Sequence, residues 1–270
     1  MNLHAKKTIT DLFKKHTTSP LKQFGQNFLV NKGVLAKIIV AAEITDQDTI
    51  IEVGPGLGVL TQELAQKAKK IVAVEKSREM IEILEETLKG FKNIEIIRED
   101  ILKLGIENYG KYKVVANLPY YITSPTIRKF LEAKNQPQKM VLMVQKEVAQ
   151  RICAKPPEMS LLAVAVQFYG RPKIISRVSR GSFWPIPKVD SAILEIIPHP
   201  GATTDSQQFF KIVKAGFAYP RKQLINNLSR GANKETVEKW LEQNDINPSQ
   251  RAETLSLEDW LNLTKNQTEN

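Results

Sequence analysis

Three segments that read as buried strands each end in residues suited to binding a ligand. Gly54, Gly56 and Gly58 follow the first, Glu75 ends the second and Asp100 ends the third. Glycines between a strand and a helix permit a tight turn and let the backbone approach a ligand closely. A carboxylate at the end of the next strand can accept hydrogen bonds from both hydroxyls of a ribose. Because open α/β sheets bind ligands at this edge, the three strand ends together predict a site for an adenosine-containing ligand.

The glycine spacing separates this site from two other kinds of nucleotide site. The residue three positions after Gly56 is Val59, whereas the dinucleotide fingerprint Gly-x-Gly-x-x-Gly needs a glycine there. The Gly-Lys-Ser/Thr of a phosphate-binding loop does not follow either. Taken alone, the glycines could form a structural turn and Glu75 could be a solvated charge, so the interpretation depends on the combination.

The segment Asn117-Leu118-Pro119-Tyr120 ends a fourth strand-like run and suits a planar amine. The side-chain oxygen of Asn117 and the carbonyl oxygen of Leu118 can each accept one N–H. Tyr120 can stack on a ring, and Pro119 stiffens the turn. A purely structural turn explains this segment less well, because a buried asparagine needs partners for its amide.

Charge is distributed unevenly along the 270 residues, which contain 39 Lys and Arg against 29 Asp and Glu for a net charge of +10. Residues 1–37 carry a net +6 and residues 171–231 a net +7, whereas residues 38–170 carry +1 and residues 232–270 carry −4. Two basic stretches beside a neutral middle indicate a nucleic-acid partner, since Lys and Arg gain affinity by releasing phosphate counterions. A solvated charged face is the plainer alternative for either stretch alone.

The remaining composition narrows the class of protein. No run of 18 apolar residues and no apolar N-terminal region occurs, so we expect neither a membrane span nor a secretory signal. The single cysteine, Cys153, cannot form an internal disulfide, which favours a cytoplasmic location. The three histidines lack partners at ligand spacing, and we therefore expect no metal site.

Strand and helix patterns alternate along most of the chain after a short amphipathic helix at about 8–16. This alternation predicts an α/β fold with a mostly parallel sheet and helices on both faces. The last two strands, at 172–178 and 191–197, could pair antiparallel at one edge. The expected strands before them are 48–54, 70–76, 94–100, 112–118 and 139–145, and the expected helices are 33–43, 57–68, 77–90, a helix from Ser124, 145–154 and 160–169.

The composition also predicts a domain boundary. Residues 198–206 read PHPGATTDS, which is typical of a linker. Beyond them the patterns are helical only. We therefore expect a catalytic domain at 1–197 and a small all-α, RNA-binding domain at 207–270.

Four motifs stand out in the chain: LKQFGQNFL (21–29), IIEVGPGLGVLT (50–61), VVANLPYYITSP (114–125) and FWPIPKVDSA (183–192). Together they resemble those of the ribosomal RNA adenine N6-dimethyltransferases of the KsgA/RsmA type, and the resemblance covers nearly the whole chain, from about Thr8 into the helical tail. The resemblance implies a Rossmann-like class I methyltransferase that uses S-adenosyl-L-methionine to dimethylate two adjacent adenosines near the 3′ end of small-subunit (16S) rRNA. It also implies a role in small-subunit maturation and an immature small subunit as partner, and we expect a monomer.

The resemblance assigns roles to individual residues. It implies that Phe183 packs the target base opposite Tyr120. The sequence departs from the family where a Pro-Pro pair usually follows the valine before that phenylalanine, because Val178 is followed by Ser179-Arg180. The implied cofactor contacts are Asn27, Leu29, Gly54, Gly56, Glu75, Asp100 and Asn117. The expected RNA contacts are Arg180, Lys188, Arg221, Lys222 and Arg230.

The chemistry follows from the atoms present. The methyl group of a sulfonium is already activated, so the enzyme must place the N6 lone pair in line with the S–CH3 bond. Hydrogen bonds from the two N6 hydrogens to Asn117 and to the Leu118 carbonyl would favour the pyramidal nitrogen that forms on attack. The target base must leave its stack, with Tyr120 and Phe183 replacing the lost stacking. Two alternatives remain open: a resistance enzyme acting on large-subunit rRNA, and a ribosome assembly factor without catalysis.

Overall fold

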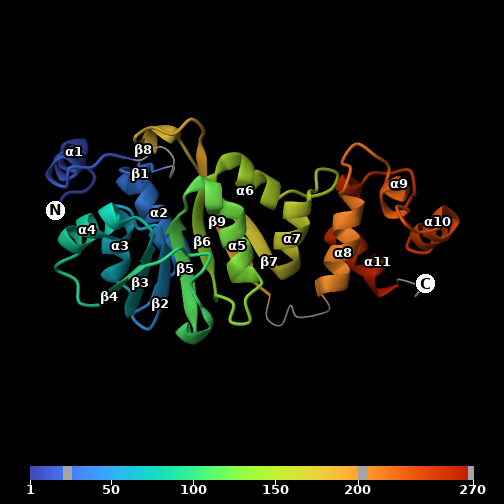
Figure 1. Ribbon diagram of the computed structural model, residues 1–270, viewed down its shortest axis with the longest axis horizontal. Helices are drawn as coiled ribbons and strands as arrows, with labels where there is room; N and C mark the ends of the chain where they lie inside the picture. The colour runs from blue at the N-terminus through green and yellow to red at the C-terminus, as the bar shows by residue number, and fades with distance from the viewer. Residues whose placement is uncertain (21–25, 200–205, 267–270) are drawn as a thin grey trace. The chain divides into compact units, whose positions relative to one another are not determined.

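Two compact units form the part of the chain that the computed structural model describes (Figure 1). The described residues are 1–20, 26–199 and 206–266. The first unit contains Met1–Ala149 and Pro172–Pro198, and the second contains Gln150–Arg171 and His199–Asn270. Within the described ranges, no helix has both the length and the apolar character needed to cross a bilayer.

A seven-stranded sheet in the order β4-β3-β2-β5-β6-β9-β7 is the centre of the first unit (Figure 1). The neighbours from β4 to β6 are parallel, whereas β9 pairs antiparallel with β6. The predicted α/β fold with a mostly parallel sheet is confirmed, and the last two strands lie together at one edge. The strands are β2 (Thr49–Val53), β3 (Lys70–Glu75), β4 (Ile94–Arg98), β5 (Tyr112–Asn117), β6 (Met140–Gln145), β7 (Gly170–Val178) and β9 (Ser191–Pro198).

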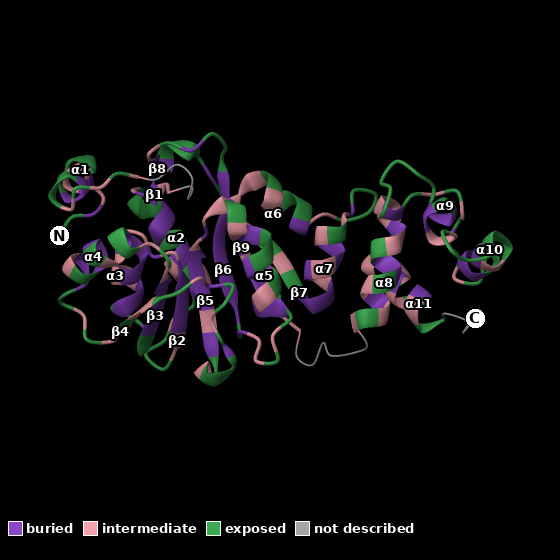
Figure 2. Cartoon of the chain, viewed as in Figure 1, coloured by how far each residue is buried: buried purple, intermediate pink, exposed green. Residues whose placement is uncertain are grey.

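Uninterrupted apolar runs explain the central strands. The runs VVA of β5 and MVLMV of β6 are buried, as Figure 2 shows for the middle of the sheet. Parallel strands covered on both faces have this character, whereas a half-exposed strand would alternate. Helix α2 packs against β5 and β6, and α3 and α4 pack against β3. The helices of this part are α1 (Lys6–Lys15), α2 (Lys32–Ala42), α3 (Val59–Ala65), α4 (Arg78–Thr87), α5 (Thr123–Leu131) and α6 (Lys146–Ile152).

Side-chain caps fix where two of these helices begin. The Asn31 side chain accepts a hydrogen bond from the Val34 N–H before α2, and the Ser77 hydroxyl accepts one from the Met80 N–H before α4. Each cap satisfies an N–H that the helix itself leaves without a partner. Ser77 is two residues after Glu75, the last residue of β3, so the cap also sets how the chain leaves that strand.

A second, two-stranded sheet forms where the sequence indicated no strand. β1 (Phe28–Leu29) pairs antiparallel with β8 (Phe183–Trp184), with Phe28 opposite Trp184 and Leu29 opposite Phe183. The Phe13 ring of α1 lies 5.6 Å from the Phe28 ring and 6.2 Å from the Trp184 ring, measured between centroids. This pairing joins two motifs that lie far apart in the sequence.

The second unit is helical, and an aromatic cluster holds it together. The Phe168 ring of α7 stacks on Phe209 of α8 with centroids 4.3 Å apart, and Tyr169 stacks on Phe210 at 5.7 Å. These contacts place residues 150–171 with the C-terminal helices, so the unit begins earlier than the expected boundary at 197. Of the expected linker 198–206, residues 200–205 lie outside the described residues. The helices are α7 (Leu161–Tyr169), α8 (Ser206–Gly216), α9 (Leu224–Leu228), α10 (Lys234–Glu242) and α11 (Leu257–Lys265).

Candidate active site

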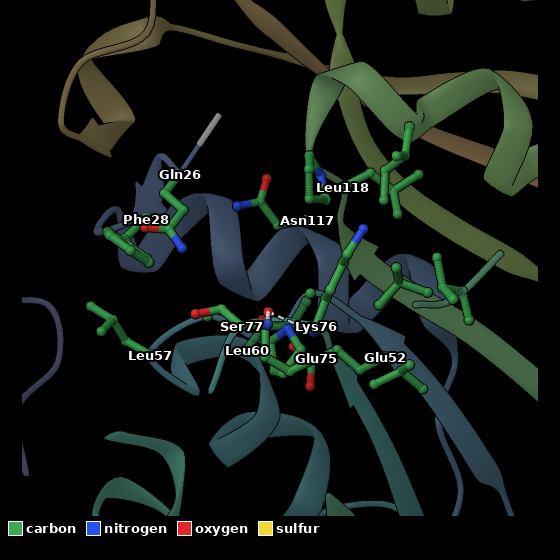
Figure 3. Close-up of a pocket in the computed structure, with 18 of the residues that line it drawn as sticks. Gln26, Phe28, Glu52, Leu57, Leu60, Glu75, Lys76, Ser77, Asn117 and Leu118 are labelled. Atoms are coloured by element: carbon green, nitrogen blue, oxygen red, sulfur yellow. Dashed lines mark hydrogen bonds between the residues drawn. The ribbon is translucent and has the colours of Figure 1, made fainter. Parts of the chain in front are cut away.

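A pocket of about 440 Å³ lies in the first unit at the carboxyl ends of β2, β3 and β5 (Figure 3). The carboxyl end of β4 also reaches the pocket, because Arg98, its last residue, and Asp100, two residues later, both line it. The segment at β1 contributes Asn27 and Leu29 from a distant part of the sequence. The structure therefore brings together the predicted cofactor residues, as a parallel sheet requires of residues at one edge. Residues 21–25 of the first family motif lie outside the described residues.

The glycines after β2 bring the backbone close to its neighbours. Gly54 and Gly56 have φ angles of 65° and 58°, in the left-handed region where side chains are strained. A Cβ atom on Gly56 would lie 3.1 Å from a ring carbon of Phe28, and one on Gly54 would lie 3.3 Å from Cδ of Pro119. Glycine at these two positions therefore avoids close contacts between a side chain and the pocket residues Phe28 and Pro119.

Glu75 ends β3 with its carboxylate held by the backbone. Its Oε1 atom accepts hydrogen bonds from the N–H groups of Lys76 and Ser77, both at 2.8 Å (Figure 3). Burial raises the pKa of Glu75, and the N–H groups of Ser77, Lys76 and Gly56 partly offset this rise because they stabilise the charged form. The carboxylate is thus oriented before any ligand binds.

Asp100 is a second fixed carboxylate on the same side of the pocket. Its Oδ1 accepts a hydrogen bond from the Leu102 N–H at 3.0 Å, and its Oδ2 accepts one from Nζ of Lys76 at 3.0 Å. These bonds lower the pKa of Asp100, the Leu102 N–H contributing most and the Lys76 ammonium next. Asp100 is therefore ionised at neutral pH and can accept hydrogen bonds from a ligand.

Glu52 is a pocket residue that the sequence analysis did not identify. It lies within β2, is only 1% exposed, and lines the pocket beside Val53. Its Oε2 atom has no hydrogen-bond partner among the described residues. The hydroxyl oxygen of Thr61 is likewise buried without a hydrogen bond in the described part of the chain. Burial raises the pKa of Glu52 to about 8, with a smaller opposing effect of Thr61 and a further rise from Glu75. The available signal was one acidic residue inside an otherwise apolar strand.

Asn117, the last residue of β5, has a fixed amide. Its Nδ2 donates a hydrogen bond to the carbonyl oxygen of Asn27 at 3.1 Å, and Figure 3 shows this nitrogen turned toward the segment with Gln26 and Phe28. With the nitrogen engaged, the oxygen is the end that can accept a hydrogen bond from a ligand.

The residues after Asn117 continue the pocket wall. Leu118 is 2% exposed, and its N–H donates to the Met143 carbonyl of β6 at 3.1 Å, which ties the segment to the sheet. Pro119 has a φ of −57° and leads into a 3-10 turn at Tyr120–Ile122. Tyr120 is half-buried, and burial raises the pKa of its phenol. Tyr121, which the sequence analysis did not single out, also lines the pocket and is 55% exposed.

Phe183 is buried, and its predicted packing against the target base stays a prediction. Its side chain is 1% exposed and belongs to the apolar core with Phe13 and Phe28. It is not among the residues that line the pocket of the proposed cofactor site. β8 pairs with β1, with Phe183 opposite Leu29, and the ring packs in the core beside this short sheet.

The five expected RNA contacts are all exposed. Arg180 and Lys188 belong to the first unit, on either side of β8. Arg221 and Lys222 belong to the second unit and lie in the turn between α8 and α9. Arg230 follows α9, where its guanidinium lies 4.2 Å from the centre of the Tyr219 ring. Such stacking holds the charge at the surface.

The pocket residues fit S-adenosylmethionine. The open backbone at Gly54 and Gly56 gives room that a Cβ atom would fill, and the oriented carboxylate of Glu75 suits a pair of hydroxyls. The Oε2 atom of Glu52 is a buried polar atom without a hydrogen-bond partner in the described part of the chain, as expected of a site completed by a polar ligand or water.

Comparisons with known proteins agree with this geometry. The family model described as ribosomal RNA adenine dimethylase matches residues 18–269. A "Ribosomal RNA small subunit methyltransferase A" of Dehalococcoides mccartyi (strain ATCC BAA-2100 / JCM 16839 / KCTC 5957 / BAV1) is 46% identical over 263 residues, which cover 94% of this chain and 90% of the relative. A protein of the same description from Bacillus mycoides (strain KBAB4) is 41% identical over 272 residues, with 94% and 93% covered.

Solved structures show the same fold. A dimethyladenosine transferase from Plasmodium falciparum superposes with a TM-score of 0.78 at 29% identity, covering 87% of this chain and 95% of that one. The 23S rRNA methyltransferase ErmE superposes with a TM-score of 0.74 at 27% identity, covering 89% and 99%. The chain thus has a Rossmann-like methyltransferase fold, and it belongs to the ribosomal RNA adenine dimethylase family.

Proposed function

We propose that this chain dimethylates N6 of two adjacent adenosines near the 3′ end of small-subunit rRNA, on an immature small subunit. The observation that carries the proposal is the Asn117 amide, whose nitrogen is engaged by the Asn27 carbonyl so that its oxygen can accept an N6 hydrogen. The relatives that are 41% to 46% identical are described as small-subunit methyltransferases, whereas ErmE, a 23S rRNA enzyme, is 27% identical. This difference favours the small subunit as substrate.

One set of pocket residues would bind the methyl donor. When bound, S-adenosylmethionine supplies a methyl group already activated by the positive sulfur. Glu75 would accept hydrogen bonds from the ribose hydroxyls and Asp100 from the adenine amine. The backbone at Gly54 and Gly56 and the residues Asn27 and Leu29 would hold the methionine end.

The acceptor side needs an amine with its lone pair aimed at the methyl group. The Asn117 oxygen and the Leu118 carbonyl would accept the two N6 hydrogens and favour the pyramidal nitrogen of the transition state. Pro119 limits how the carbonyl before it can turn. Tyr120 would stack on the base after it leaves the RNA stack. No residue has to deprotonate the neutral amine before it attacks.

Phe183 would have to become exposed before it could contact the target base. Because the ring is buried against the core, it could stack on the second face of the base only if β8 shifts and exposes it. In the observed structure Phe183 is paired with Leu29 of β1. The residue before β1, Asn27, orients Asn117 through its carbonyl oxygen.

RNA binding would depend on the exposed cations. Phosphate contacts from Arg and Lys position an RNA substrate without reading its sequence, and recognition of folded rRNA comes mainly from shape. The residues proposed for these contacts are Arg180, Lys188, Arg221, Lys222 and Arg230.

The test is transfer of labelled methyl groups to immature small subunits, followed by mapping of the modified nucleotides. Naked large-subunit RNA in parallel distinguishes the alternative substrate. Two adjacent dimethyladenosines in small-subunit rRNA are the expected result. Label found only in large-subunit RNA would overturn the substrate assignment, and binding to subunits without any transfer would support an assembly factor instead.

A further inference from the structure

A hydrogen bond links the two motifs that surround the proposed base site. The phenol oxygen of Tyr120 lies 2.8 Å from Oγ of Ser191, a residue 71 positions later in the sequence. Ser191 is 0% exposed, so its hydroxyl depends on protein partners. Tyr120 is half-buried and is one of the residues that line the pocket. The bond therefore connects a pocket side chain to the core of the sheet.

The sheet order explains how this contact arises. β9 runs antiparallel to β6 with Ser191 opposite Gln145, so the first residue of β9 lies at the edge where β6 ends. β5 is the other neighbour of β6, with Asn117 opposite Met143. The loop after β5 must consequently reach past the end of β6 for the Tyr120 phenol to meet Ser191.

The start of β9 is itself held in place from two directions. The Asp190 carboxylate accepts a hydrogen bond from the Arg180 N–H at 3.0 Å, and the Asp190 carbonyl accepts one from the Lys146 N–H at 3.0 Å. Ser191 follows directly and is the first residue of the ladder with β6. Its hydroxyl is thus a fixed anchor and not a mobile surface group.

The two ends of Tyr120 are fixed by different parts of the chain. Its backbone belongs to the 3-10 turn that follows Pro119, and its phenol is tied to Ser191. A ring held at both ends keeps one orientation, and a stacking partner that is already oriented loses less entropy when the base arrives.

We propose that Ser191 is a positioning residue for methyl transfer, acting through Tyr120, whose ring it holds in the orientation that stacks on the target adenine. The inference rests on the stacking role proposed above for Tyr120. Ser191 touches neither the base nor the donor in this arrangement. Its effect should appear in the rate of transfer and not in the affinity for the subunit, which phosphate contacts supply.

The experiment is a double-mutant cycle with Ser191→Ala, Tyr120→Phe and the double variant, measured by single-turnover transfer to immature small subunits at saturating S-adenosylmethionine. Each single variant should be about fivefold to tenfold slower, the effect of one ordinary hydrogen bond. The double variant should be no slower than either single one, because both changes remove the same bond. The subunit concentration at half-maximal rate and the affinity for the cofactor should remain at the parent values.

A matched control is Ser160→Ala in the second unit. The Ser160 hydroxyl accepts a hydrogen bond from the Ala163 N–H at 3.2 Å at the start of α7, so its loss also destabilises the fold but does not touch Tyr120. This variant should transfer methyl groups at the parent rate at a temperature where it is folded. Tyr120→Phe keeps the ring and its packing, so it carries the test even if Ser191→Ala does not fold.

Three outcomes distinguish the role of Ser191 from the stacking role of Tyr120. Multiplied effects in the double variant would show that Ser191 and Tyr120 act independently, and the inference would be overturned. Parent rates in Ser191→Ala and Tyr120→Phe, together with a slow Tyr120→Ala, would overturn the inference but leave the stacking proposal standing. A parent rate in Tyr120→Ala would remove the stacking role itself.

Discussion

Replacing Asn117 by alanine should slow methyl transfer about 10²-fold or more, the cost of losing one hydrogen bond that strengthens in the transition state. The structure gives this expectation a specific reason, because the Asn117 nitrogen donates to the Asn27 carbonyl at 3.1 Å and the side chain cannot turn over without losing that bond. The oxygen is therefore oriented before the base arrives. A preoriented acceptor requires no reorganisation during the reaction, which is why its loss should be costly.

The same substitution should also weaken cofactor binding, by a smaller factor. Asn117→Ala removes the bond to the Asn27 carbonyl, and residues 27–29 line the donor side of the pocket. An ordinary neutral hydrogen bond contributes about 1 kcal/mol, so a decrease in affinity of about fivefold is expected. Asn27→Ala should not reproduce this effect through Asn117, because the acceptor is a backbone carbonyl that alanine retains.

The assay is single-turnover transfer on immature small subunits at saturating S-adenosylmethionine, with monomethyladenosine and dimethyladenosine quantified separately. Asn93→Ala is a suitable control, since the Asn93 amide also donates to backbone carbonyls, those of Ala65 and Ala68, but does not line the pocket. It should lose stability without losing the rate of the folded enzyme. If Asn117→Ala dimethylates at the parent rate, the segment is a structural turn and the proposed mechanism is wrong.

Three further outcomes are expected. Glu75→Ala should weaken S-adenosylmethionine binding at least tenfold, because each charged hydrogen bond lost to a ribose hydroxyl costs about 1.5–3 kcal/mol, and unchanged affinity in calorimetric titration would contradict the cofactor assignment. The pKa of Glu52 is raised from 4.5 to about 8, so the stability that its protonated form gives is fully present below pH 4.5 and is lost as the pH rises toward 8. The parent protein should therefore lose about 2 kcal/mol of unfolding free energy between pH 6 and pH 8 that the Glu52→Gln variant does not lose, as measured by urea denaturation without cofactor. An equal loss in both proteins would show that Glu52 is ionised in the folded state. Reversing Arg221 and Lys222 to Glu should weaken subunit binding and reduce its salt dependence without changing cofactor affinity, whereas an unchanged salt slope would mean that this turn is only a solvated surface.

Residues that depend on strand ends could be predicted from the sequence. Gly54, Glu75, Asp100 and Asn117 each follow or end an apolar run, and parallel strands bring such ends to one edge whatever their separation in the chain. The structure places all four around one pocket. The alternation that predicted the sheet therefore also predicted the site.

Residues that depend on tertiary pairing could not be predicted in this way. β1 and β8 contain two residues each, which is too short for a periodic pattern, and only their pairing buries Phe183. Ser191 stood inside a recognised motif, but its bond to Tyr120 depends on β9 lying beside β6. The boundary between the two units likewise depends on the stacking of Phe168 on Phe209. Helical periodicity shows that a segment is a helix, but it does not show which other helix it packs against.

Two groups of charges in the first unit would meet different ligands. Acidic groups line the pocket, where S-adenosylmethionine would bring a positive sulfur, and Asp100 is ionised there because Leu102 and Lys76 stabilise its charge. Basic groups such as Arg180 and Lys188 are exposed, where an RNA phosphate can reach them. Exposed charges are screened by salt much more than buried ones. Raising the salt concentration should therefore weaken the affinity for the subunit far more than the affinity for the methyl donor, and methylation at high salt should recover when the subunit concentration alone is raised.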